Sequence, residues 1–280
     1  MKTTFITPRK SAEAFLQIVR ETDTSGTERP KRFQKIMKEN RGMVHSLSPF
    51  APPGDGLERK NPVIVALGDS VTAGHFEFAG EPAELFARAG AGQLQETDVI
   101  DITDARECYL ERFRFKLIDY YEQTSVSTVN CGIAGDTIIG MEKRLERDVI
   151  RYQPDLVIIN GSLNWDRECG TAADYRRILG AVVDRILADT EADVILLTPN
   201  MEVPSPFTGP VSTLGERVAV IREMAREKQV CLGDAYLAWE RYEEAGYLVR
   251  DLLANGVNHP SAVGHEAYAE VLMKLIREDG

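Results

Sequence analysis

From residue 61 onward, short apolar runs rich in valine and isoleucine alternate with longer segments of helical periodicity. This alternation is typical of parallel β-α-β units, and it constrains the fold more than any other feature of the chain. The apolar runs are nearly continuous, as expected for strands that are covered by helices on both faces. The predicted strands are Val63–Leu67, Ser125–Cys131, Leu156–Asn160, Asp193–Thr198 and Val230–Leu232. The predicted helices cover 107–123, 137–152, 171–189, 212–228 and 261–277.

These elements predict one α/β domain over residues 61–280, with three layers (α/β/α) and a doubly wound, five-stranded parallel sheet. Right-handed crossovers bring the carboxyl ends of the strands to one edge, where the ligand sites of such sheets lie. Side chains that follow the strands are therefore the first candidates for chemistry.

Residues 1–60 differ in composition from the rest of the chain. They are polar, and they end in a turn-rich stretch, 49–56, that contains three prolines and two glycines. We expect an N-terminal extension that packs on or flanks the core, with short helices near 11–21 and 28–40.

The charge balance excludes several function classes. Forty-four acidic residues against 33 basic ones give a formal net charge of −11 and a pI near 5.0. Such a field repels phosphate backbones and anionic lipids, so we expect neither a nucleic-acid nor a membrane partner. The first 20 residues lack the pattern of a signal peptide, and the four cysteines are widely spaced, so we expect a reduced, cytoplasmic protein.

A serine and a histidine are candidates for nucleophilic catalysis. Ser70 follows the first predicted strand directly after Gly68-Asp69, where a nucleophile would be presented at the sheet edge. The alternative is a serine that caps the next helix. His259 precedes a predicted helix and is a candidate base, with a solvated loop histidine as the alternative. His45 and His75 lack the spacing to the other histidines that a metal site would show, so we predict no metal.

Two further strand exits carry groups that could contact a ligand. The second strand is followed by Gly132 and Gly135, which suit a close approach of the backbone to a ligand. An ordinary β-α turn is the alternative there. Asn164 follows the third strand, where its amide can reach a shared site or form a local turn.

Ser70, Gly135, Asn164 and His259 occur in this order, and the strings Gly68-Asp69-Ser70 and Gly132–Thr137 (Gly-x-x-Gly-Asp-Thr) accompany them. This pattern resembles the SGNH hydrolases, also called GDSL esterases and lipases, over residues 62–275. The resemblance implies their flavodoxin-like fold, with Ser70 as nucleophile and His259 as base. It also implies an oxyanion hole formed by the backbone N–H groups of Ser70 and Gly135 and the side chain of Asn164. No cofactor is required.

Two blocks depart from the family pattern. The family's Gly-x-Asn-Asp block is Ser162-Leu163-Asn164-Trp165 in this chain, which keeps the asparagine and shifts the glycine to Gly161 and the aspartate to Asp166. The family's Asp-x-x-His block has Gly256 where the acid is expected. Asn255, Asn258, the more distant Asp251 or a backbone carbonyl would then orient the imidazole. We favour a backbone carbonyl or the Asn255 oxygen.

The segment from His75 to Cys108 is an insertion after the nucleophile, and it carries Phe76, Phe78 and Phe86. We expect a helix near 81–91 and a role in shaping the substrate site. The predicted function is hydrolysis of a small-molecule ester through an acyl-enzyme, with an acetylated carbohydrate as the preferred substrate. A non-catalytic ligand-binding module is the alternative from another class, and a thioesterase or short-chain lipase is the alternative within the family.

Overall fold

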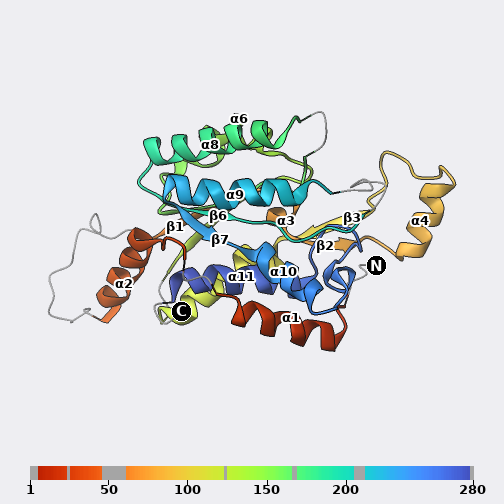
Figure 1. Ribbon diagram of the computed structural model, residues 1–280, viewed down its shortest axis with the longest axis horizontal. Helices are drawn as coiled ribbons and strands as arrows, with labels where there is room; N and C mark the ends of the chain where they lie inside the picture. The colour runs from red at the N-terminus through yellow and green to blue at the C-terminus, as the bar shows by residue number, and fades with distance from the viewer. Residues whose placement is uncertain are drawn as a thin grey trace.

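The computed structural model describes residues 6–23, 26–45, 61–122, 125–165, 169–204 and 212–277. Its centre is a five-stranded parallel sheet (Figure 1), and its strands lie in the order β4-β1-β5-β6-β7. The strands are β1 (Val63–Gly68), β4 (Ser127–Gly132), β5 (Leu156–Asn160), β6 (Asp193–Leu197) and β7 (Cys231–Gly233). Each predicted strand is confirmed with its ends shifted by at most two residues, and the predicted α/β class is confirmed.

Alternate side chains of each central strand enter two separate cores. Ile64 and Ala66 of β1 pack on one side of the sheet, and Val65 and Leu67 pack on the other. The second core contains α6 (Ile138–Lys143), α7 (Leu145–Asp148), α8 (Ala172–Asp189) and α9 (Leu214–Lys228). The first contains α1 (Arg9–Glu21), α5 (Tyr109–Tyr120), α10 (Ala235–Glu244) and α11 (Ala262–Ile276). Burial on both faces explains the continuous apolar runs of the strands.

Some elements differ from the sequence prediction. The helix expected over 137–152 is divided at Arg144 into α6 and α7 and followed by the 3-10 turn η2 (Ile150–Tyr152). Gln153, which follows this turn, has a left-handed backbone (φ 43°), which ends the helical segment just before β5. Helix α10 and the 3-10 turn η3 (Val249–Leu252) were not predicted.

The N-terminal residues pack against the α/β core. Phe15 of α1 is fully buried and meets Trp239 and Tyr242 of α10 edge-on, with ring centroids 4.9 and 5.3 Å apart. Helix α2 (Lys31–His45) is anchored beside the sheet, since the Phe33 N–H donates to the Asp193 carboxylate at 2.8 Å. The turn-rich stretch 49–56 lies outside the described residues.

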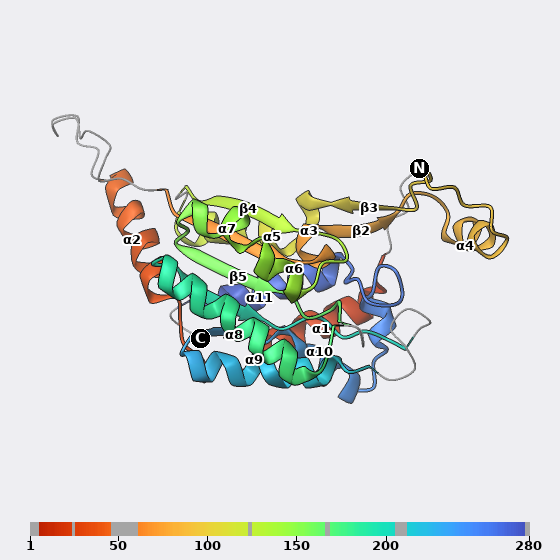
Figure 2. The same cartoon turned by 90° about the horizontal axis from the view of Figure 1, so that it is seen from above.

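The segment from His75 to Cys108, which we interpreted as an insertion, folds as a hairpin with a helix between its strands. Strands β2 (His75–Phe78) and β3 (Asp101–Asp104) pair antiparallel and flank α4 (Pro82–Gly90), and the 3-10 turn η1 (Ala105–Glu107) follows β3. Helix α4 has no buried residue, and it lies at the end of the molecule away from α2 in both views (Figure 2). None of the described helices is long and apolar enough to cross a membrane.

Candidate active site

Ser70 lies where β1 passes into the short helix α3 (Ser70–Ala73). The preceding Asp69 is fully buried and caps this helix, because its Oδ1 accepts a hydrogen bond from the Val71 N–H at 3.0 Å. A Cβ atom at Gly68 would lie 2.0 Å from Thr72 Oγ1, so only glycine fits there. These constraints place the Ser70 hydroxyl at the carboxyl edge of the sheet.

His259 contacts Ser70 directly. Its Nε2 lies 2.8 Å from Ser70 Oγ, although the two residues are 189 positions apart in the chain. The loop that carries the histidine is closed at its base by an isolated bridge between Leu253 and Pro260, and the Ala254 N–H donates to the His259 carbonyl at 2.7 Å. The structure thus brings together the serine and histidine that the sequence singled out.

Two asparagines surround the other ring nitrogen. Asn255 Oδ1 accepts hydrogen bonds from the backbone N–H groups of Val257, Asn258 and His259 at 2.9 to 3.0 Å. These three donors determine the orientation of the Asn255 amide, so its NH₂ group, and not its oxygen, faces the imidazole. Our expectation that the Asn255 oxygen orients His259 is therefore not supported.

Asn258 offers an acceptor at this nitrogen. Its Oδ1 lies 2.8 Å from His259 Nδ1 and also accepts a hydrogen bond from the Asn255 NH₂ at 2.9 Å. The Asn255 nitrogen lies 2.8 Å from the same Nδ1. Only the tautomer with hydrogen on Nδ1, donated to Asn258 Oδ1, leaves Nε2 free to accept a proton from Ser70.

Asp251, the third candidate for orienting the histidine, lies in η3 and faces the N-terminal helix. It accepts a hydrogen bond from the Ser11 hydroxyl of α1 at 2.9 Å. Within the described part of the chain, no hydrogen bond or ion pair joins Asp251 to His259. The groups that touch the imidazole are neutral.

Burial shifts the pKa of two groups at this site in opposite directions. Burial lowers the pKa of His259 to about 4, because the imidazolium form would lose its hydration. The imidazole is therefore neutral at pH 7 and able to accept a proton. Burial, with a smaller contribution from the nearby Asp136 carboxylate, raises the pKa of Asp69 to about 7.

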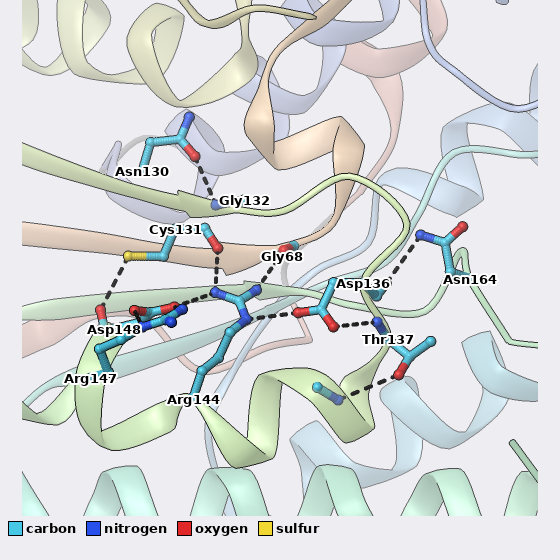
Figure 3. Close-up of polar contacts among 11 residues, drawn as sticks. Gly68, Asn130, Cys131, Gly132, Asp136, Thr137, Arg144, Arg147, Asp148 and Asn164 are labelled. Atoms are coloured by element: carbon cyan, nitrogen blue, oxygen red, sulfur yellow. Dashed lines mark hydrogen bonds and ion pairs between the residues drawn. The ribbon is translucent and has the colours of Figure 1, made fainter. Parts of the chain in front are cut away.

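The loops that carry Gly135 and Asn164 lie on either side of the serine loop. They follow β4 and β5, the two neighbours of β1 in the sheet. Gly135 has a left-handed backbone (φ 74°), which favours glycine. Asn164 donates from Nδ2 to the Asp136 carbonyl at 3.1 Å, which connects the two loops and leaves the second amide hydrogen for another acceptor (Figure 3). Asp166 lies outside the described residues.

Arg144, which sequence reasoning missed, connects the ends of β1 and β4 and the turn at Asp136. Its guanidinium donates to the Gly68 carbonyl at 2.9 Å and the Cys131 carbonyl at 2.7 Å (Figure 3). It also forms ion pairs with Asp136 at 2.7 Å and with Asp148 at 2.6 Å. The side chain is only 8% exposed. One buried cation thus fixes the exits of β1 and β4 and the residue that follows Gly135.

The β2–β3 hairpin contributes Phe76, one of the phenylalanines in the segment that we expected to shape the substrate site. The Phe76 ring packs against the His259 imidazole, with centroids 5.0 Å apart and planes inclined by 38°. Among the described residues, no group of three or more histidine, cysteine, aspartate or glutamate side chains is arranged to hold a metal ion.

The GDSL-like Lipase/Acylhydrolase family model matches residues 66–267, which is more than half of the chain. The chain belongs to this family. It is therefore an ester-bond hydrolase by family, and the residues just described lie within the matched region. No curated protein sequence matches it.

Solved structures share the fold of this GDSL hydrolase at low identity. A variant of the acetyl xylan esterase Axe2 from Geobacillus stearothermophilus is 23% identical, with a TM-score of 0.56 over 77% of this chain and 94% of that one. A lipase/acylhydrolase from Enterococcus faecalis is 23% identical, with a TM-score of 0.56 over 77% and 95%. LAE5, an alpha/beta hydrolase enzyme from the metagenome of Lake Arreo, is 21% identical, with a TM-score of 0.57 over 77% and 94%.

Proposed function

We propose that this GDSL hydrolase is a serine esterase that works through an acyl-enzyme. The observation that carries the proposal is the 2.8 Å contact between Ser70 Oγ and His259 Nε2, with a neutral imidazole. Such a pair is the arrangement that activates a serine hydroxyl. A non-catalytic binding module would not need it.

The proposed reaction has two halves. Ser70 Oγ bonds to the ester carbonyl carbon while its proton passes to His259 Nε2, and Nδ1–H of the resulting imidazolium donates to Asn258. When the tetrahedral intermediate collapses, the bond to the alcohol oxygen breaks and Nε2 returns the proton to that oxygen. Water then attacks the acyl-Ser70 ester by the same steps, which release the acid and restore the enzyme.

The proposed oxyanion hole consists of the backbone N–H groups of Ser70 and Gly135 and the side chain of Asn164. The strand order supports this assignment, because the three residues follow β1 and its two neighbours. Removal of one such donor typically costs about 10²–10³ in kcat. Asn164→Ala should therefore lower kcat with little change in KM.

We propose an acetyl ester of a carbohydrate as the substrate. Support comes from the structural likeness to the acetyl xylan esterase Axe2, and a lipase/acylhydrolase is equally similar. The test is a hydrolysis panel of acetate, butyrate and long-chain esters, thioesters and acetylated sugars, with Ser70→Ala as the blank. The proposal predicts the highest kcat/KM for acetylated sugars. A higher kcat/KM for thioesters or for long acyl chains would contradict the substrate and favour the alternatives within the family.

A further inference from the structure

Strand β2 presents two aromatic side chains on the face directed toward the site. Its residues alternate between buried and half-buried, with His75 and Glu77 on the buried face and Phe76 and Phe78 on the other. His75 anchors the buried face, since its ring meets that of His265 on α11 edge-on at 5.7 Å. The hairpin is therefore fixed at its root, and its phenylalanine face is left partly open.

The aromatic rings form a continuous strip that begins at the histidine. Phe76 packs on His259, Phe78 meets Phe76 edge-on at 5.0 Å, and Phe86 of α4 meets Phe78 edge-on at 5.8 Å. Phe86 is 59% exposed. The strip begins at the half-buried Phe76 and Phe78 and ends at the exposed Phe86, so it extends from the reacting atoms to solvent.

Polar side chains lie directly across the hairpin from the two strand phenylalanines. In the antiparallel register Phe76 faces Thr103, and Phe78 faces Asp101. Directly opposed residues project from the same face of a hairpin, and both of these polar residues are exposed. The face thus combines aromatic rings with hydrogen-bonding groups, the mixture that small-molecule sites use for orientation.

The mechanism indicates which half of the ester this strip would meet. His259 Nε2 must deliver its proton to the leaving alcohol oxygen, so that oxygen has to approach the imidazole within hydrogen-bond distance. Phe76 covers the imidazole, so the group attached to that oxygen extends past Phe76 toward Phe78 and Phe86. The acyl group is attached to the carbonyl carbon and is not drawn toward the histidine in this way.

We propose that Phe78, Phe86, Asp101 and Thr103 bind the alcohol half of the ester, and that this alcohol is a neutral sugar ring. A sugar ring has C–H faces that pack on aromatic rings and hydroxyl groups that need partners such as Asp101 and Thr103. The inference rests on the proposed serine esterase function, because only a leaving alcohol directed to His259 is placed beside the strip.

The test compares two series of esters on Phe86→Ala and Phe78→Ala. The first series keeps the acetyl group and changes the alcohol, from methyl acetate to peracetylated xylose and acetylated xylobiose. The second keeps methanol and changes the acyl group from acetate to butyrate. Phe115→Ala is the matched control, since Phe115 lies on α5 outside the hairpin and is 58% exposed.

We expect Phe86→Ala and Phe78→Ala to lower kcat/KM for the sugar acetates about fivefold to tenfold, mainly through KM, as loss of a ring contact would. In both variants, kcat/KM for methyl acetate and the ratio of kcat/KM for acetate to that for butyrate should stay within twofold of wild type. Phe115→Ala should leave kcat/KM unchanged for every ester. Any of three results would overturn the inference. These are an altered acetate-to-butyrate ratio, a loss of kcat/KM on methyl acetate equal to that on the sugar acetates, or an unchanged kcat/KM for the sugar acetates. Wild type that hydrolyses no ester would instead overturn the proposed function itself.

Discussion

At the residue scale, burial and neutral neighbours determine the pKa and the orientation of the His259 imidazole, and no carboxylate among the described residues bonds to it. Ser70 Oγ contacts Nε2, Asn258 Oδ1 contacts Nδ1, and the Phe76 ring packs against the imidazole. The buried His265 interacts with it electrostatically, and burial holds the pKa of His265 itself well below the ordinary value. Among the described residues, no charged partner opposes the loss of hydration, which is why the His259 pKa falls.

The pH dependence of activity should show this low pKa. Because burial lowers the His259 pKa to about 4, the neutral base is lost only as the pH falls through that value. We expect kcat/KM for a neutral acetate ester to be half-maximal near pH 4. Circular dichroism at each pH and reassay at pH 7 control for acid unfolding.

Asp69 is the second group at this site whose pKa is shifted, and the variant Asp69→Asn removes its titration from the pH profile. Burial raises the Asp69 pKa to about 7, so any inflection near neutrality that comes from this carboxyl should vanish in the variant. The fall in kcat/KM near pH 4 should remain in both wild type and Asp69→Asn. A fall in kcat/KM near pH 6.5, which is about the ordinary pKa of histidine, would show that His259 is hydrated in solution.

Asn258 is the second residue-scale test, because it can be changed to an acid of the same shape. In Asn258→Asp a carboxylate oxygen takes the place of Oδ1, 2.8 Å from Nδ1. An opposite charge at this distance should raise the His259 pKa by about 1–3 units and move the acid limb upward. Asn258→Leu, which removes the acceptor, should lower kcat about 10- to 100-fold with KM nearly unchanged. An acid limb that stays in place in Asn258→Asp would exclude Asn258 as the group that orients His259.

At the element scale, the site depends on how three strand exits are held against one another. Arg144 lies between α6 and α7 and bonds to the exits of β1 and β4 and to Asp136. Asn130 adds a second connection, since its Nδ2 donates to the Thr72 carbonyl of α3 at 2.8 Å and its Oδ1 accepts the Gly132 N–H at 2.9 Å. The loop positions are thus set by contacts remote from the reacting atoms.

We predict that Arg144→Lys lowers kcat at least tenfold while KM changes little. A lysine keeps the charge, but it cannot match the several directed bonds of the guanidinium, so the Gly135–Asp136 turn and the attached Asn164 would lose their position. Arg147→Ala is the matched control, because Arg147 pairs with the same Asp148 but is 61% exposed and should keep full activity. A folded Arg144→Lys variant with wild-type kcat would contradict this positioning role.

The strands and the order of the candidate residues could be predicted from the sequence, because both depend on local apolar runs and short strings. The β2–β3 hairpin could not be predicted from the sequence, because its two strands have only four residues each and are separated by 22 residues that include α4. The orientation of the Asn255 amide depends on three backbone N–H groups that only the folded loop brings together. Arg144 belongs to no sequence motif. Its role follows from hydrogen bonds to carbonyl groups of residues that lie 13 and 76 positions away in the chain.

At the scale of the whole molecule, the N-terminal residues act as part of the core. Phe15 and Val19 of α1 and Phe33 and Met37 of α2 are fully buried in the same core as α10 and α11. Asp251 belongs to this contact, because it accepts the Ser11 hydroxyl. Helix α1 therefore covers apolar surface that the α/β domain would otherwise expose.

Phe15→Ala should lower the free energy of unfolding by about 3–5 kcal/mol, the usual cost of removing a buried phenylalanine. Urea unfolding at pH 7 measures this loss. Phe115→Ala, on an exposed ring, should stay within about 0.5 kcal/mol of wild type. A loss below 1 kcal/mol for Phe15→Ala would mean that α1 contributes little to the stability of the core.

The central claim is that Ser70 is a nucleophile activated by His259, and covalent labelling tests it most directly. The protein is treated with a fluorophosphonate probe at pH 7, and the intact mass is measured for wild type, Ser70→Ala and His259→Ala. We predict one added phosphonyl group on wild type, located at Ser70 by peptide mass spectrometry. Ser70→Ala should remain unlabelled, and His259→Ala should react at least 100-fold more slowly. Labelling of Ser70→Ala at the wild-type rate, or a labelled peptide that does not contain residue 70, would contradict the account.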